Sequence, residues 1–132
     1  MTEQPESYRC RGGCHCGRVQ IAVTVSTQIT VNQCNCSICS KTGHVHLIVA
    51  RDELEVLQGR EELTEYRFNT RTARHFFCRH CGVKPFYVPR SHPDGYSVNL
   101  NCLELAPEIE VTLEHFDGRH WRQNISGLLQ DG

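Results

Sequence analysis

Short runs in which apolar and polar residues alternate recur along the chain and predict β-strands. In residues 19–25 (VQIAVTV) every second side chain is Val or Ile, as on the buried face of a half-exposed strand. Residues 45–50 (VHLIVA) form a short apolar run suited to a buried strand. Further candidate strands are residues 54–57, 63–68, 75–77, 83–88, 96–105 and 109–113. The side chains expected to share a strand face are Val19, Ile21, Val23 and Val25, then Val98, Leu100 and Cys102, then Ile109, Val111 and Leu113.

Turn residues and the lack of a helical period complete this interpretation. Residues 58–60 (QGR) separate two candidate strands, and residues 78–82 separate the two arms of a predicted hairpin. No stretch long enough for a stable helix has apolar residues at helical spacing. The sequence therefore predicts an all-β fold with little helix: a single small domain of short antiparallel strands and hairpins.

The chain length of 132 residues fits one domain. We expect a polar N-terminal segment at residues 1–8, one domain at residues 9–125 and a C-terminal tail at residues 126–132. Residues 1–8 have neither a basic start nor an apolar run, so they do not resemble a signal peptide. No apolar stretch approaches the ~18 residues of a membrane span. These features predict a cytoplasmic protein without a membrane partner.

Charge and cysteine content narrow the function classes. A formal net charge of −1 and a pI near 6.7 give no electrostatic footprint for nucleic acid. The nine cysteines are far more than usual for this length, and their number is odd. Because cytoplasmic thiols are kept reduced, this density indicates metal binding rather than a disulfide framework.

Seven of the nine cysteines form three clusters with ligand-like spacing. In an extended segment residues i and i+2 share a face, and Cys-x-x-Cys brings its two sulfurs together through a tight turn. Gly17 and Gly82 follow two of the clusters and can take a positive φ, which lets backbone N–H groups approach the thiolates. The clusters are Cys14 and Cys16, then Cys34, Cys36 and Cys39, then Cys78 and Cys81. Outside them, Cys10 is predicted to be a free thiol near a frayed chain end and Cys102 a small core residue.

Clusters of two, three and two cysteines divide most simply into a four-sulfur site and a three-sulfur site. A structural zinc takes four protein ligands, whereas a catalytic zinc keeps three and leaves one position open. The first and third clusters would then form the closed site, and the second cluster the open one. Spacing leaves two alternatives: a second site completed by Cys10, His44 or His46, and a single zinc with spare thiols. Zinc binds model peptides with ~10–16 kcal/mol, so either arrangement would help a thin β core to fold.

The three clusters and their flanks resemble the glutathione-dependent formaldehyde-activating enzyme family, whose domain also occurs in centromere protein V. The resemblance extends from about Tyr8 to Trp121. Its strongest parts are residues 12–17 (GGCHCG), 34–39 (CNCSIC) with Lys41-Thr42-Gly43, and 77–82 (FCRHCG). Weaker agreement is found at Gly59, Tyr66, Val98-Asn99 and residues 116–121 (FDGRHW).

This resemblance implies a β-tent fold with two zinc ions per chain. It implies a structural zinc on Cys14, Cys16, Cys78 and Cys81, and a second zinc on Cys34, Cys36 and Cys39 that marks the active site. The implied activity is that of a carbon–sulfur lyase acting in reverse, which condenses glutathione with formaldehyde to S-hydroxymethylglutathione. The implied partners are therefore a small thiol and a small aldehyde.

A zinc held by three thiolates suits a fourth, soft ligand such as a substrate thiol, which metal binding would deprotonate. His44 and His46 lie near the open site in sequence and are candidates for a ligand or a proton carrier. The carboxylates of glutathione would need basic side chains, for which Lys41, Arg71, Arg74 and Arg79 are candidates.

The competing interpretation is a non-enzymatic binding module, in which both zinc ions are structural and the scaffold serves as a docking surface. The chain shows no basic tail and no disordered extension that would recruit partners. This favours a free-standing enzyme.

Overall fold

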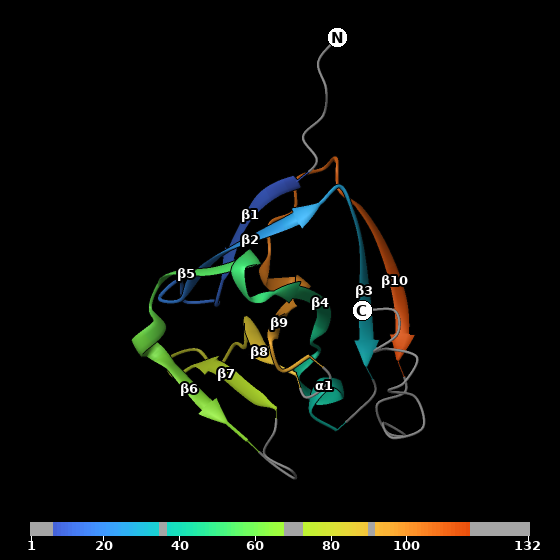
Figure 1. Ribbon diagram of the computed structural model, residues 1–132. Coiled ribbons are helices and arrows are strands. Elements are labelled where there is room, and N and C mark those ends of the chain that lie inside the picture. The colour runs from blue at the N-terminus through green and yellow to red at the C-terminus, as the bar shows by residue number, and fades with distance from the viewer. Residues whose placement is uncertain (1–6, 35–36, 68–72, 90–91, 117–132) are drawn as a thin grey trace.

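The computed structural model describes residues 7–34, 37–67, 73–89 and 92–116, and strands dominate them (Figure 1). The strands are β1 (Ser7–Gly13), β2 (Gln20–Ser26), β3 (Gln28–Cys34), β4 (Val45–Ala50), β5 (Leu54–Gln58), β6 (Leu63–Tyr66), β7 (Arg74–Cys78), β8 (Phe86–Val88), β9 (Gly95–Asn99) and β10 (Glu110–Phe116). The only α-helix in this part of the chain is α1 (Ser37–Thr42). The predicted all-β class with little helix is confirmed. None of the helices described is long and apolar enough to cross a membrane.

The strands form two sheets. One has the order β1-β2-β5, and the other has the order β10-β3-β4-β9-β8-β7-β6. The chain passes from the first sheet to the second at Thr27, the single residue between β2 and β3. In Figure 1 the small sheet and the β3–β10 pair converge at one end of the molecule and diverge towards α1. Every strand pairing is antiparallel among the described residues except β10 with β3, which is parallel.

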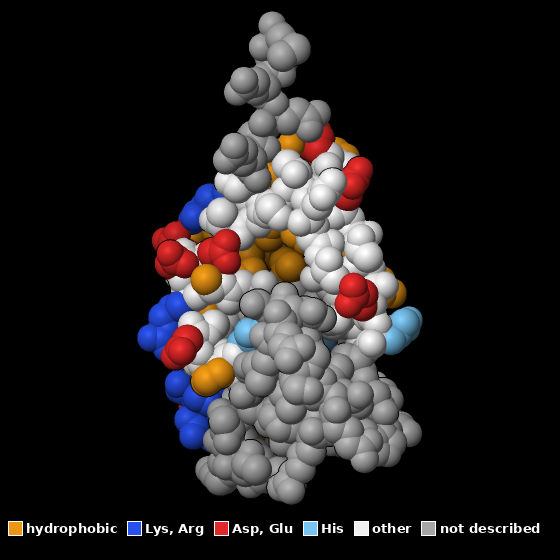
Figure 2. Space-filling model, turned by 45° about the vertical axis from the view of Figure 1, so that its right-hand side comes forward, with side chains coloured by type: hydrophobic (Ala, Val, Ile, Leu, Met, Phe, Trp, Pro, Cys, Tyr) orange, Lys and Arg blue, Asp and Glu red, His pale blue; other side chains and the backbone are white. Residues whose placement is uncertain are grey.

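The main core lies between the two sheets. The small sheet contributes Cys10, Ile21, Val23, Val25 and Leu54, and the large sheet contributes Ile29, Val31, Leu47, Val49, Phe86 and Val98. Each aliphatic side chain buried here stabilises the fold by about 1.5–3 kcal/mol. Figure 2 shows hydrophobic side chains in a hollow on one face of the molecule.

Several predicted strands are observed nearly as expected. The strand predicted at residues 45–50 is β4, and the four apolar residues predicted to share a face in residues 19–25 are all buried. The predicted hairpin is formed by β7 and β8, which pair His75 with Tyr87. Phe68, at the end of another candidate strand, lies outside the described residues.

Other expectations are corrected by the structure. The strand predicted at residues 96–105 ends at Asn99, because the Asn99 side chain accepts a hydrogen bond from the Asn101 N–H and the chain turns into a 3-10 helix at Leu100–Cys102. Val111 and Leu113 are 43% and 51% exposed, because β10 is an edge strand. Cys10 is a free thiol as predicted, but it is buried within β1 rather than near a frayed end. The division into residues 1–8, 9–125 and 126–132 stays a prediction.

Candidate metal centres

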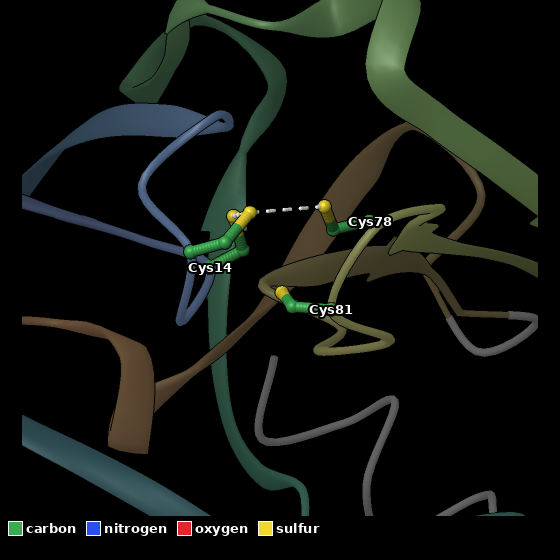
Figure 3. Close-up of side chains that lie close together, drawn as sticks. Cys14, Cys78 and Cys81 are labelled. Carbon is green, nitrogen blue, oxygen red and sulfur yellow. Dashed lines mark hydrogen bonds between the residues drawn. The ribbon is translucent and has the colours of Figure 1, made fainter.

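The four-cysteine group brings together thiols held by elements of the two sheets. Cys14 and Cys16 lie on the loop between β1 and β2, while Cys78 ends β7 and Cys81 lies in the turn that follows it. Their sulfur atoms all lie within 4.8 Å of one another. Figure 3 shows Cys14 facing Cys78 and Cys81 across the space between the two loops. This is the four-cysteine group expected from the sequence.

Local backbone geometry turns these sulfurs inward. The Cys14 N–H donates to the Val19 carbonyl at 3.1 Å, which closes the first loop, and the Gly82 N–H donates to the Cys78 carbonyl at 2.8 Å, which closes the second. Gly17 and Gly82 have φ values of 82° and 78°, as predicted. The N–H groups that point at sulfur belong to other residues: Val19 donates to Cys14 Sγ at 3.3 Å and His80 to Cys78 Sγ at 3.4 Å.

The spacing and protonation of the four-cysteine group suit zinc. Cys16 Sγ lies 3.6 Å from both Cys14 Sγ and Cys78 Sγ. A tetrahedron with zinc–sulfur bonds of ~2.3 Å has sulfur atoms about 3.8 Å apart. The Arg18 backbone N–H, with the Arg18 guanidinium, lowers the pKa of Cys16 to about 6, whereas burial raises the pKa of Cys14 to about 11. Four thiols so close together would share protons, and a divalent cation can replace these protons.

A second group of side chains joins Cys34, Cys39 and His46, and it is called the second cluster from here on. Cys34 ends β3, Cys39 lies in α1 and His46 lies in β4, and their ligand atoms lie within 4.8 Å of one another. His46 Nε2 is 3.1 Å from Cys39 Sγ. Cys36, predicted to be the third sulfur of this site, lies outside the described residues. Two thiols and an imidazole are a donor set that zinc accepts.

A buried polar layer lies behind His46. Ser97 Oγ, on β9, is 2.8 Å from His46 Nδ1 and 3.1 Å from His44 Nε2, and the Tyr87 hydroxyl is 3.2 Å from His46 Nδ1. Burial, with the nearby His46 and Lys84, lowers the pKa of His44 well below its ordinary value. The His44 ring is therefore neutral at pH 7.

The polar layer continues towards β7. Lys84 donates to His75 Nδ1 at 3.0 Å, and its Nζ lies 4.5 Å from the centroid of the Tyr87 ring. The His75 and Tyr87 rings are stacked with centroids 4.5 Å apart. Sequence analysis missed Ser97, Tyr87, Lys84 and His75. The signal that could have found them is the presence of polar residues inside otherwise apolar strand segments.

The basic candidates for carboxylate recognition are placed differently. Arg74 donates to Glu65 at 2.8 Å, and Arg79 donates to Glu62 at 2.8 Å. These two arginines are thus paired with carboxylates of the chain itself. Lys41 is exposed at the end of α1, and Arg71 lies outside the described residues.

Fold and site define a class of protein: a small cysteine-rich β domain with two groups of side chains that could hold a metal ion. Residues 9–119 match the family model described as glutathione-dependent formaldehyde-activating enzyme. The chain belongs to this family, which confirms the resemblance drawn from the cysteine clusters. A crystal structure of a Rhodobacter sphaeroides protein, a structural genomics target, is also similar, with 38% sequence identity and a TM-score of 0.66. The match covers 79% of this chain and 99% of that one.

Proposed function

We propose that this chain is a zinc-dependent carbon–sulfur lyase that acts in the cytoplasm and condenses glutathione with formaldehyde to S-hydroxymethylglutathione. The observation that carries the proposal is the convergence of Cys34, Cys39 and His46 in a chain of this family. We assign a structural zinc to Cys14, Cys16, Cys78 and Cys81, and a second zinc to Cys34, Cys36 and Cys39, which form the catalytic site. Cys36 is included on its sequence spacing and on the family resemblance, because it lies outside the described residues.

The residues of the second cluster suit a reaction of thiols. The chemistry that a bound zinc supplies is stabilisation of the thiolate form of glutathione at pH 7, where a free thiol is mostly protonated. Cys39 and His46 are 4% and 6% exposed, so a substrate sulfur held beside them would be shielded from water. Low exposure strengthens electrostatic interactions within the site.

The proposed reaction balances without a further reactant. The S–H bond of glutathione breaks, its sulfur bonds to the carbon of formaldehyde, and the proton ends on the former carbonyl oxygen. Holding thiol and aldehyde side by side replaces an encounter in solution by a reaction within one complex. In the reverse direction the same C–S bond breaks and the thiolate returns to the site.

Exchange NMR tests this proposal, because it measures the interconversion of glutathione and S-hydroxymethylglutathione at equilibrium. Zinc-loaded protein is expected to accelerate the exchange above the uncatalysed rate. Cys39→Ser and Cys36→Ser are expected to return it to that rate. Cys102→Ser is the matched control, because Cys102 lies outside both clusters, and it is expected to keep both the zinc content and the rate.

Two results would contradict the proposal. If wild-type protein carrying two zinc ions gives no acceleration, the site does not catalyse this reaction, and a zinc-stabilised binding module becomes the better interpretation. If Cys39→Ser accelerates exchange as the wild type does, the catalytic site lies elsewhere.

A further inference from the structure

His46 presents one ring nitrogen to the sulfur atoms of the second cluster. Its Nε2 lies 3.1 Å from Cys39 Sγ and within 4.8 Å of Cys34 Sγ. The three residues come from β3, α1 and β4, so the fold brings them together from separate elements. At 6% exposure, the imidazole is also largely removed from water.

The other ring nitrogen of His46 lies within hydrogen-bonding distance of two hydroxyl groups. Its Nδ1 lies 2.8 Å from Ser97 Oγ and 3.2 Å from the Tyr87 hydroxyl. Both hydroxyls can accept an Nδ1–H hydrogen bond. Metal-ligating histidines almost always donate the N–H of the non-ligating nitrogen in this way, which fixes the tautomer and aims the other nitrogen at the ion.

From this geometry we infer that His46 Nε2 is a ligand of the second metal ion, beside the sulfur atoms of Cys34 and Cys39. The inference rests on the proposed function to the extent that the second cluster must bind a metal. It adds a nitrogen donor to a site assigned above to cysteines alone. With Cys36 the ion would then have four protein ligands, so a substrate thiol would bind as a fifth ligand or displace one of the four. The imidazole is neutral, so it adds a ligand without adding a further negative charge to the thiolates.

A purely structural role for His46 makes a different prediction. In that case Nε2 would carry the proton and donate it to the Cys39 sulfur, while Nδ1 would accept from a hydroxyl. A ring nitrogen that carries a proton cannot bind a metal. The two roles therefore differ in a single measurable property, a bond between the metal and Nε2.

Cadmium NMR distinguishes these roles. The protein is labelled with ¹⁵N-histidine and loaded with ¹¹³Cd, and bound cadmium per chain is counted by mass spectrometry. We expect a scalar coupling between ¹¹³Cd and the Nε2 of one histidine, assigned through its ring protons in the wild type. We expect His46→Gln to abolish this coupling and to weaken cadmium binding at one site by more than tenfold. His115→Gln, on the exposed face of β10, is the control and is expected to keep the coupling.

The outcomes separate this inference from the proposed function. Two cadmium ions per chain with no coupling to His46 would overturn the inference and leave the cysteine site standing. A coupling that survives His46→Gln would overturn it as well. A single cadmium ion per chain, bound without any coupling to nitrogen, would overturn both the inference and the second metal of the proposed function. The wild-type coupling decides the question even if His46→Gln does not fold.

Discussion

Ser97 is fully buried on β9, and its hydroxyl lies between two imidazoles. Its hydroxyl lies 2.8 Å from His46 Nδ1, so we propose that it positions His46 in the second cluster. We expect Ser97→Ala to lower metal affinity at the second site by about 10–100-fold, the usual effect of removing a hydrogen-bond partner behind a ligand. Competition with a chromophoric chelator measures this, and affinity at the four-cysteine site should stay unchanged.

The control for this prediction is Ser40→Ala, because Ser40 is exposed on α1. Equal affinities in Ser97→Ala and the wild type would show that the hydroxyl does not orient His46.

Gly59 lies where the chain leaves the small sheet for β6, and its backbone has a φ of 83°. A Cβ added there would lie 2.0 Å from the Arg18 carbonyl oxygen, so the backbone would have to move. Gly43 has a φ of 66°, but a Cβ added there would meet no atom within 4 Å. We expect Gly43→Ala to destabilise the fold by about 1–2 kcal/mol, the cost of left-handed backbone, and Gly59→Ala to cost distinctly more. Urea unfolding at constant zinc concentration compares them, and equal losses would contradict the clash.

At the scale of elements, Glu65 on β6 joins its neighbour β7 through Arg74. Hydrogen bonds from Arg74, and then from Arg67, lower the pKa of Glu65 from 4.5 to about 2. The folded carboxylate thus stays charged where the unfolded one takes up a proton. The ion pair stabilises the fold fully above pH 4.5, and this contribution is lost as the pH falls towards 2. Because the pair is partly exposed, we expect Glu65→Gln to cost less than about 1 kcal/mol at pH 7.

Carbon-13 NMR of the Glu65 carboxyl checks the direction of the shift. No inflection is expected between pH 7 and pH 4 in the wild type, whereas Arg74→Ala should bring the titration up towards 4.5. An unchanged titration curve in Arg74→Ala would contradict the assigned cause. Glu61→Gln serves as the control for stability, because Glu61 is exposed in the 3-10 helix Arg60–Glu62 that precedes β6.

Local pattern predicted β2 from its alternating Val and Ile residues and β4 from its short apolar run, although burial does not alternate regularly in either strand. It could not predict which sheet a strand joins: β5 and β6 flank one short turn in sequence but belong to different sheets. The parallel pairing of β10 with β3 joins segments far apart along the chain, and no local signal carries that direction. At the end of β9 the Asn101 backbone N–H donates to the Asn99 side-chain oxygen, a contact that periodicity does not report.

The same limit applies to the candidate sites across the whole molecule. Cys-x-x-Cys spacing reveals thiols that meet within one turn, so the four-cysteine group could be proposed from sequence. His46 lies near Cys34 because β3 pairs with β4, and Ser97 reaches His46 because β9 pairs with β4. Such contacts are set by sheet order rather than by spacing. Sequence analysis could therefore name His46 as a candidate but could not choose it over His44.

The four-cysteine group also has a role in the architecture of the molecule. Cys14 and Cys16 belong to a loop of the small sheet, and Cys78 and Cys81 to a hairpin of the large one. A metal bound there would join the two sheets at a small buried cluster. Among the described residues this cluster holds Cys14, Val19 and Cys78, with Leu63, Cys81 and Val83 partly buried against it. Structural zinc contributes ~10–16 kcal/mol in model peptides, which is comparable with the whole stability of ~5–15 kcal/mol of a typical domain.

Removing the metal should therefore unfold more than the loops that hold it. We expect chelation at pH 7 under reducing conditions to abolish the dispersed amide spectrum of the domain, and added zinc to restore it. Cys81→Ser should behave like the chelated protein at low zinc, whereas Cys102→Ser should behave like the wild type. A chelated protein that keeps the wild-type spectrum and melting temperature would show that the apolar core between the sheets suffices alone. In that case the four thiols would have a chemical role rather than a role in stabilising the fold. The packing of the two sheets does not itself require four sulfur atoms at one point.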